Sequence, residues 1–277
     1  MKALITGISG FVGSHLAEYL LRETDFEVAG TAFGPTDNIA SLRDRVQIYP
    51  AELSHLEVVS FIFHETQPDL VFHLAAQPLT SLSREDPWHT LESNIRMQLN
   101  VLEAARRLQL PCRILVVGSS EVYGLVREDE LPITEETPLR PLNPYGVSKV
   151  AQDMLGLQYY LSDGIQAIRV RPFNHIGPRQ RLGFVAPDFA KQVAEAEAGL
   201  REPVIRVGNL DVCRDFSDVR DVVRAYHLAI TQGEPGQVYN IGSGEARSIR
   251  SLLEGLIRLS RVPLRYEEDP ARRRPTS

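Results

Sequence analysis

Three side chains in the middle of the chain, Ser119, Tyr145 and Lys149, have the types and spacing needed to transfer a proton to a carbonyl oxygen. Tyr145 and Lys149 lie four residues apart in "NPYGVSKV", so on a helix they share one face. Asn143 and Pro144 are typical of the start of that helix. A phenol, with a pKa of about 10, becomes a better acid or base near neutral pH when an ammonium stabilises its phenolate. Ser119 either hydrogen-bonds the reacting oxygen beside Tyr145 or serves as a cap or turn residue.

Glu121 lies two residues after Ser119 in "VVGSSEVYG". A carboxylate there fits a base that removes a proton from carbon. It equally fits an acceptor for substrate hydroxyls or a support for the serine loop, and the purely structural alternative is a surface turn. The sequence leaves these roles open.

A glycine-rich loop stands near the start of the chain. In "LITGISGFVGSH", Gly7, Gly10 and Gly13 follow an apolar strand and open a helix. Such glycines permit a tight turn and let a pyrophosphate approach the free N–H groups of the helix N-terminus. We expect these glycines, with Phe11 and Val12 between them, to bind a dinucleotide; the alternative is an ordinary glycine turn.

The apolar pattern predicts the elements that position these residues. The runs "KALIT", "EVAGTAF", "DLVFHLAA", "RILVVGS" and "IQAIRVRPF" are typical of buried strands separated by helices. The rhythm predicts an α/β fold, a doubly wound parallel sheet of the Rossmann type over residues 1–173. A smaller substrate-binding lobe is expected over 174–277, with some segments returning to the first sheet. Its expected elements are helices near 187–198, 219–231 and 248–259 and the strands "PVIRVG" and "QVYNIGS".

Composition narrows the class of protein. The 277 residues are 43% hydrophobic with a net charge of −6, which suits a buried core and gives no electrostatic reason to expect nucleic-acid or membrane binding. Cys112 and Cys213 lack the spacing of a disulfide framework or a metal site. The chain opens on the strand-like "MKALITG" with no charged leader or long apolar segment. These features predict a metal-free protein of the reducing cytoplasm.

Several motifs together resemble the extended branch of the short-chain dehydrogenase/reductase superfamily: the GxxGxxG spacing, "VFHLAAQ" and "SNIRMQLNVLEAA". The resemblance implies a nicotinamide dinucleotide and a homodimer formed through the helices that include Tyr145. It implies that Leu74, Ala75 and Ala76 line the cofactor channel and that Asn94 braces the central helix.

The preference for NAD or NADP depends on the residues at the end of the second strand. An acidic residue there binds the ribose of NAD, and an arginine accommodates the extra phosphate of NADP. "AGTAFGPTDN" has neither at that point. Asp37 and Arg43 follow in the loop. Either could contact the cofactor at the ribose, or each could be a surface charge. We expect NADPH to be favoured and NADH to be possible.

The motifs "RPFNHIGPRQ", "VGNLDVCRDFSDVRDVVRAY" and "VYNIGSG" resemble more narrowly the reductases of GDP-4-dehydro-6-deoxy-D-mannose. That resemblance implies hydride transfer to the C4 ketone of a GDP-linked sugar, with Tyr145 as proton donor and GDP-D-rhamnose as product. The GDP-mannose 4,6-dehydratases share the motifs and have a glutamate where this chain has Glu121. UDP-sugar 4-epimerases are a third alternative.

The same resemblance implies substrate contacts. Arg214 matches a diphosphate-binding arginine, and a guanidinium fork suits paired phosphate oxygens; an ion pair with Asp215 or Asp218 is the alternative. Four further residues are implied: Pro172 near the nicotinamide, Asn174 at the sugar, Lys191 at the nucleotide and Arg274 at a phosphate.

Overall fold

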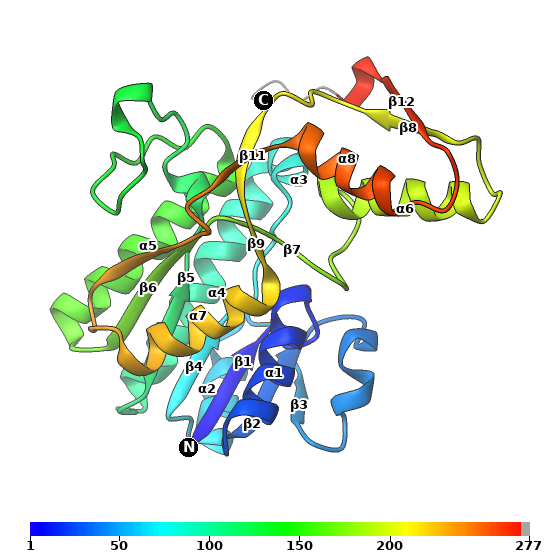
Figure 1. Cartoon of the computed structure of the whole chain (residues 1–277). Helices are drawn as coiled ribbons and strands as arrows, with labels where there is room; N and C mark the ends of the chain where they lie inside the picture. The colour runs from blue at the N-terminus through cyan, green and yellow to red at the C-terminus, as the bar shows by residue number, and fades with distance from the viewer. Residues whose placement is uncertain (273–277) are drawn as a thin grey trace. The chain divides into compact units, whose positions relative to one another are not determined.

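The computed structural model of the chain describes residues 1–272 and consists of two compact units. The first combines Met1–Phe173 with Asp218–Ile241, and the second combines Asn174–Ser217 with the chain from Gly242 onward. Both units are drawn in Figure 1. The segment 218–241 therefore returns to the first unit after the chain has begun the second.

The first unit is built on a seven-stranded sheet in the order β10-β6-β5-β4-β1-β2-β3, and every neighbouring pair is parallel. From β1 the order runs outward through β2 and β3 on one side and through β4, β5, β6 and β10 on the other. This reversal confirms the doubly wound sheet, and it leaves a ligand site at the carboxyl ends of β1 and β4. The strands are β1 (Lys2–Thr6), β2 (Glu27–Ala32), β3 (Gln47–Pro50), β4 (Leu70–His73), β5 (Arg113–Val117), β6 (Gln166–Pro172) and β10 (Val238–Ile241).

Alternate strand residues face two helical layers. Ile5 and Phe72 belong to the core with helices α1 and α7, whereas Leu4 and Val71 belong to the core with α2 and α4. Burial on both faces explains why these strands read as continuous apolar runs. The helices of this unit are α1 (Phe11–Glu23), α2 (Leu56–Thr66), α3 (Thr80–Glu85), α4 (Pro87–Arg107), α5 (Pro144–Asp163) and α7 (Val219–Gln232).

The second unit has a three-stranded sheet, β11-β9-β7, and a parallel pair, β12-β8. Helices α6 and α8 pack against each other, and their core contains Phe189, Val193 and Leu253. The expected strand "PVIRVG" appears as β8. The elements are β7 (Asn174–Ile176), α6 (Val185–Glu197), β8 (Val204–Val207), β9 (Cys213–Asp218), β11 (Ala246–Ser248), α8 (Ile249–Leu259) and β12 (Arg265–Glu268).

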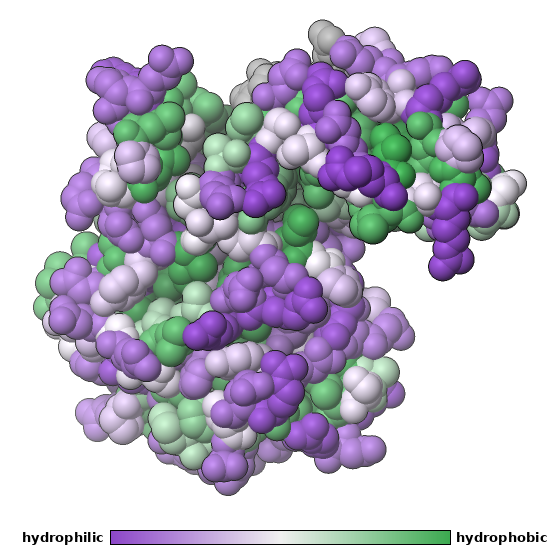
Figure 2. Space-filling model, viewed as in Figure 1, coloured by the Kyte–Doolittle hydropathy of each residue, from purple (hydrophilic) through white to green (hydrophobic). Residues whose placement is uncertain are grey.

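The surface is of the mixed kind expected from the composition. On the face drawn in Figure 2, polar and charged side chains cover most of each unit, with apolar side chains scattered among them. Across residues 1–272, no helix has both the length and the apolar character needed to cross a membrane.

Candidate active site

The glycine loop has backbone geometry that other residues would strain. Gly7 follows β1 with a φ of +70°, and a Cβ there would meet the backbone nitrogen of Ala75 at 3.2 Å. A Cβ on Gly13 would lie 2.3 Å from the carbonyl oxygen of Gly7, which is too close for any side chain. The amide of Gly10 donates to the same oxygen at 3.0 Å. The glycines therefore allow the loop, the segment after β4 and the start of α1 to pack without side chains between them.

The first turn of α1 is suited to an anion. Gly10 is the N-cap and provides no side-chain cap, and the first turn, which starts with Phe11, Val12 and Gly13, contains no acidic residue. The first N–H groups of a helix lack intrahelical acceptors, and the helix dipole favours negative charge at that end. These features fit a pyrophosphate, as the sequence predicted for the loop.

Thr6 joins the glycine loop to the segment after β4. Its Oγ1 accepts hydrogen bonds from the amides of Leu74 at 3.0 Å and Ala75 at 3.1 Å, and it bonds Nδ1 of His73 at 2.9 Å. With both lone pairs occupied, the hydroxyl hydrogen goes to Nδ1, so His73 carries its proton on Nε2. Burial, with a smaller effect from the charge of Lys149, lowers the pKa of His73 to about 3, so the ring is neutral. The sequence had not identified Thr6 as this link.

Asn94 of α4 connects the same segment to α5. Its Oδ1 accepts from the amide of Gln77 at 2.8 Å, and its Nδ2 donates to Oγ of Ser148 at 3.0 Å. The hydroxyl of Ser148 donates in turn to the carbonyl of Tyr145 at 2.7 Å. The partly buried Ala76, the third residue of the expected cofactor channel, lies directly before Gln77.

The structure brings Ser119, Tyr145 and Lys149 together. Ser119 follows β5 and Tyr145 lies in the first turn of α5, and the Ser119 hydroxyl lies near enough to the phenol to lower its pKa. Nζ of Lys149 lies 5.8 Å from the centre of the Tyr145 ring and donates to the carbonyl of Val117 at 2.9 Å. Lys149 is only 5% exposed, so little water surrounds its Nζ.

Burial shifts the acidity of both residues of the tyrosine–lysine pair. It raises the pKa of Tyr145 above the usual range of a phenol, the bond from Ser119 opposes that rise, and the charge of Glu121 adds to it. Burial also lowers the pKa of Lys149 to about 7. Tyr145 is therefore a protonated phenol at neutral pH, which is the form that donates a proton.

Glu121 is hydrogen-bonded both to Ser119 and to Asn143 at the start of α5. Its amide donates to Oγ of Ser119 at 3.2 Å, and its Oε2 accepts from Nδ2 of Asn143 at 2.8 Å. Asn143 is the N-cap of α5, and its Oδ1 accepts from the amide of Gly146 at 2.8 Å. The carboxylate is partly buried and held, unlike a free surface turn.

A buried ionic network stabilises the loop that carries Ser119, and the sequence analysis did not predict it. Asp153 of α5 accepts from Arg169 at 2.5 Å and from Arg171 at 2.6 Å. Arg171 also donates to the hydroxyl of Tyr123 at 3.0 Å, and that hydroxyl donates to Asn240 at 2.7 Å. The available signal was two arginines, two residues apart in the apolar "IRVRPF", which place two charges on one buried face of β6.

The ring of Phe173 stacks on Tyr123, with 6.4 Å between the ring centres. The preceding residue, Pro172, is buried at the end of β6 and lies opposite Ile241 of β10. The residue expected near the nicotinamide thus lies at the carboxyl edge of the sheet, beside the strand that carries Ser119 at its end.

Arg214 in the second unit does not form the ion pair that was its structural alternative. Its Nη1 donates to the carbonyl of Cys213 at 2.8 Å. The carboxylate of Asp215 accepts instead from the amides of Ser243 and Gly244, both at 2.8 Å. Asp218 is paired with Arg220 at the start of α7. Arg214 is exposed on β9.

The other predicted substrate residues are spread over the second unit. Asn174 is the first residue of β7 and is partly buried. Lys191 is exposed on α6 and paired with Glu195, one turn along the same helix. Arg274 lies outside the described residues.

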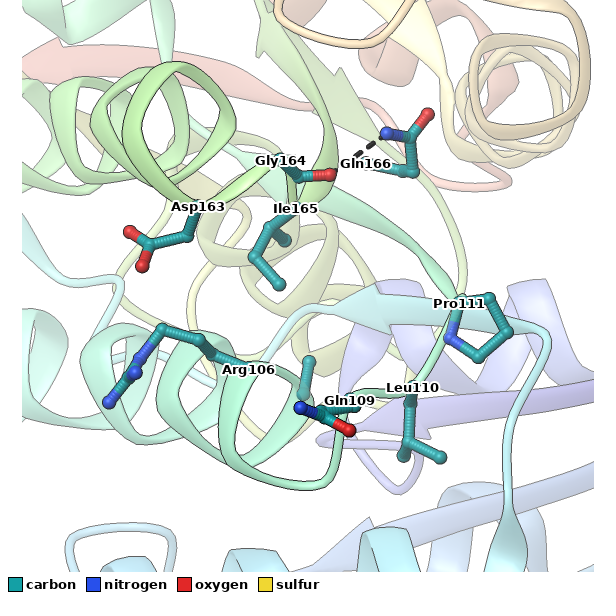
Figure 3. Close-up of a pocket in the computed structure, with 9 residues that line it drawn as sticks. Arg106, Gln109, Leu110, Pro111, Asp163, Gly164, Ile165 and Gln166 are labelled. Atoms are coloured by element: carbon teal, nitrogen blue, oxygen red, sulfur yellow. Dashed lines mark hydrogen bonds between the residues drawn. The ribbon is translucent and has the colours of Figure 1, made fainter.

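A pocket of about 480 Å³ lies elsewhere in the first unit, where α4 and α5 end and β5 and β6 begin. Figure 3 shows Arg106 and Asp163 on either side of it. Arg106 is bound to Glu103, at 2.9 Å. This is the edge of the sheet opposite to Ser119, so the pocket is separate from the candidate site. Within residues 1–272, no group of three or more histidine, cysteine or acidic side chains is placed to hold a metal ion.

Comparison with known proteins gives consistent matches. The sequence model of the GDP-mannose 4,6 dehydratase family matches residues 4–268. The GDP-6-deoxy-D-mannose reductase of Pseudomonas aeruginosa is 38% identical, over 99% of this chain and 84% of that protein. A GDP-mannose 4,6-dehydratase of Vibrio cholerae is 32% identical, over 96% of this chain and 74% of that protein.

Two solved structures are similar across the chain. The structure of RMD from Pseudomonas aeruginosa complexed with NADPH has a TM-score of 0.86 at 38% identity and covers 98% of this chain and 88% of that one. The UDP-glucose 4-epimerase of Thermus thermophilus in complex with NAD has a TM-score of 0.87 at 32% identity, with 100% and 88% coverage.

Proposed function

Because the chain belongs to the GDP-mannose 4,6-dehydratase family, within the extended short-chain dehydrogenases/reductases, we propose that it reduces a GDP-linked 4-keto sugar. The substrate would be GDP-4-dehydro-6-deoxy-D-mannose and the product GDP-D-rhamnose. The observation that carries the proposal is the group of Ser119, Tyr145 and Lys149, in which the serine and the lysine are buried and the tyrosine is partly buried. The similarity to the Pseudomonas aeruginosa reductase, over nearly the whole chain, supports this choice of substrate.

The residues at the carboxyl ends of β1 and β4 fit a nicotinamide dinucleotide. Gly7, Gly10 and Gly13 leave room for a pyrophosphate at the start of α1, and Leu74 and Ala75 are held beside the loop by Thr6. When bound, the reduced dinucleotide would supply the hydride that is transferred to C4. Two similar proteins were solved with NADPH and with NAD, which supports a cofactor of this class.

We infer that NADPH is favoured, with NADH accepted. β2 ends at Ala32, and Phe33 and Gly34 follow, so no carboxylate stands where the ribose of NAD would be bound. The exposed guanidinium of Arg43 bends back to Thr36, at 2.7 Å, and so lies next to this loop. A cation there favours the extra phosphate of NADPH.

Tyr145 would deliver the proton to the oxygen on C4 as that oxygen gains negative charge. Burial keeps the phenol protonated at neutral pH, so the donor is ready before reduction begins. Ser119 would donate a hydrogen bond to the same oxygen and fix its position. Lys149 would stabilise the phenolate left behind, because its ammonium lies below the ring at 5.8 Å.

A dehydratase acting on GDP-mannose is the second candidate, and one observation favours it. Glu121 lies close enough to Tyr145 for its charge to raise the phenol's pKa, so a carboxylate is available near the reacting carbons. A dehydratase needs such a base to remove the C5 proton. The bond from Asn143 to Glu121 fits better a carboxylate that supports the site.

In the second unit, Arg214 would bind the diphosphate and Asn174 the sugar. Arg214 is exposed and has no carboxylate partner among residues 1–272, which supports its role. Lys191 would have to break its ion pair with Glu195 to reach a nucleotide, so we expect its contact to be weaker than that of Arg214.

Two incubations test the proposal. In the first, the purified protein receives GDP-4-dehydro-6-deoxy-D-mannose with NADPH or with NADH, and we expect one equivalent of reduced cofactor to be consumed per GDP-rhamnose formed. In the second, it receives GDP-mannose without a reductant, and we expect no 4-keto product. Rapid formation of the 4-keto sugar in the second incubation would favour the dehydratase.

We also propose that the enzyme forms a homodimer through α5. Val147, Met154 and Leu161 are spaced seven residues apart on one face of this helix and are 44%, 38% and 71% exposed. A second copy would cover them. In sedimentation experiments Met154→Glu should yield monomers, whereas Arg258→Glu, on α8, should not.

We place the enzyme in the reducing cytoplasm, because both cysteines are free thiols. Burial raises the pKa of the Cys112 thiol to about 12, which keeps it unreactive.

A further inference from the structure

Two arginines face each other across the three-stranded sheet of the second unit. Arg247 of β11 is the register partner of Arg214 of β9 in an antiparallel pair. The two strands are neighbours in the three-stranded sheet β11-β9-β7. Side chains directly opposite in such a pair lie on one face with their Cβ atoms about 5 Å apart, and like charges in this position are destabilising. Both arginines are exposed. The sheet therefore places two positive charges side by side, although it would be more stable with only one of them.

The nearby acidic groups do not neutralise this pair. Asp215 alternates to the other face of β9, and its carboxylate is occupied by the loop at Ser243. Glu245 is paired with Arg247 at 2.6 Å, but the two side chains are 66% and 62% exposed. Such an exposed ion pair contributes little because both charges remain hydrated. Glu245 thus pairs with Arg247 alone and Arg214 donates to the carbonyl of Cys213, so the face keeps an excess positive charge.

We propose that Arg214 and Arg247 together bind the two phosphoryl groups of the nucleoside diphosphate, with Arg247 exchanging Glu245 for a phosphate. Arg214 was expected to contact the diphosphate, and Arg247 is the new member of the site. Each guanidinium offers a planar fork that bonds two phosphate oxygens, which is stronger than the exposed contact to Glu245. The inference rests on the proposed function only in requiring a nucleoside diphosphate as part of the substrate.

Calorimetry with GDP and GMP tests the pair on the full chain, with UDP as a second diphosphate. We expect Arg247→Gln to weaken GDP binding by about tenfold or more, the usual effect of losing a charge-assisted hydrogen bond. GMP has one phosphate and should lose much less, so the preference for GDP over GMP should fall. Arg247→Lys, which keeps the charge but lacks the fork, should lie between. Arg265→Gln is the matched control, because Arg265 is an exposed arginine on β12 of the same unit; it should bind GDP as the wild type does.

Thermal unfolding separates binding from a structural role. Removing one of two like charges should leave the melting temperature of Arg247→Gln unchanged or slightly higher, while binding weakens. Glu245→Gln releases Arg247 and should tighten GDP binding a few-fold.

Three results would overturn the proposed role of the two arginines. The first is that Arg247→Gln binds GDP within twofold of the wild type and keeps the preference over GMP. The second is that both Arg247 variants lose binding together with a lower melting temperature that explains the loss, and the third is that the wild type binds neither GDP nor UDP. The proposed reduction can fail separately. A wild type that binds GDP through both arginines without reducing the keto sugar would leave the pair standing.

Discussion

Asn143 binds Glu121 with one end of its amide and caps helix α5 with the other. Its Nδ2 donates to Oε2 of Glu121 and its Oδ1 accepts from the amide of Gly146, both at 2.8 Å. Glu121 in turn donates its amide to Ser119 at 3.2 Å. The carboxylate is thus part of a frame that fixes the start of α5, and with it Tyr145, relative to the serine.

We predict that Glu121→Gln lowers reduction of the keto sugar by less than about tenfold, well below the usual effect of losing a proton-transfer group. The amide keeps a carbonyl oxygen that accepts from Asn143, so the frame survives. Initial rates of NADPH consumption measure this. If the wild type instead eliminates water from GDP-mannose and Glu121→Gln abolishes that reaction, Glu121 is a catalytic base and the reductase assignment is wrong.

Tyr145→Phe should lower the rate of reduction by about 10²–10⁴-fold, because the ring remains and only the proton donor is lost. The dissociation constant of the dinucleotide, measured by fluorescence titration, should change little. Tyr160→Phe, on the same helix, is the control and should keep wild-type activity. Near wild-type reduction by Tyr145→Phe would remove this residue from the reaction.

The buried Lys149 should make stability depend on pH. Burial lowers its pKa from 10.5 to about 7, so between these values the unfolded chain binds more protons than the folded one. The free energy of unfolding should therefore rise with pH above 7, by at most about 1.4 kcal/mol per pH unit from this residue. The raised pKa of Cys112 acts in the opposite sense above its unfolded value of 9.0, so the test is confined to pH 7–9.

Urea unfolding of the protein without dinucleotide, at several pH values in that window, checks this effect. Lys149→Met should flatten the rise, and Lys191→Met, which alters an exposed lysine on α6, should not. An equal rise in the Lys149→Met protein would show that Lys149 is not the titrating group.

Gly13→Ala should disrupt the glycine loop. The new Cβ would lie 2.3 Å from the carbonyl oxygen of Gly7, a backbone atom that cannot move without opening the turn. We expect a loss of stability of about 1–3 kcal/mol, as for other overpacked sites, together with loss of dinucleotide binding. Gly255→Ala is the matched helical control, because the nearest atom is the end of the Arg258 side chain at 3.8 Å, and it should stabilise by about 0.5–1 kcal/mol. Unaltered dinucleotide affinity in Gly13→Ala would contradict the close packing of the loop.

The sequence was sufficient for features that depend on near neighbours. Apolar runs such as residues 2–6 and 113–117 predicted the buried parallel strands, because burial on both faces leaves few places for polar residues. The glycine spacing predicted the loop at α1, and the spacing of Tyr145 and Lys149 placed both on one face of α5. In each case a local period or a local steric limit determines the structure.

Only the tertiary structure decided which distant segments meet. The pairing of β10 with β6 brings Asn240 to Tyr123, and helix packing supplies Asp153 as the counterion of two arginines in β6. β11 has only three residues and β9 is mostly polar, so no apolar period marked them, and the meeting of Arg214 with Arg247 depends on their register. Spacing along the chain determines the face on which a residue lies, but the partner across that face depends on how strands and helices far apart in sequence pack, because many alternative pairings satisfy the same local pattern.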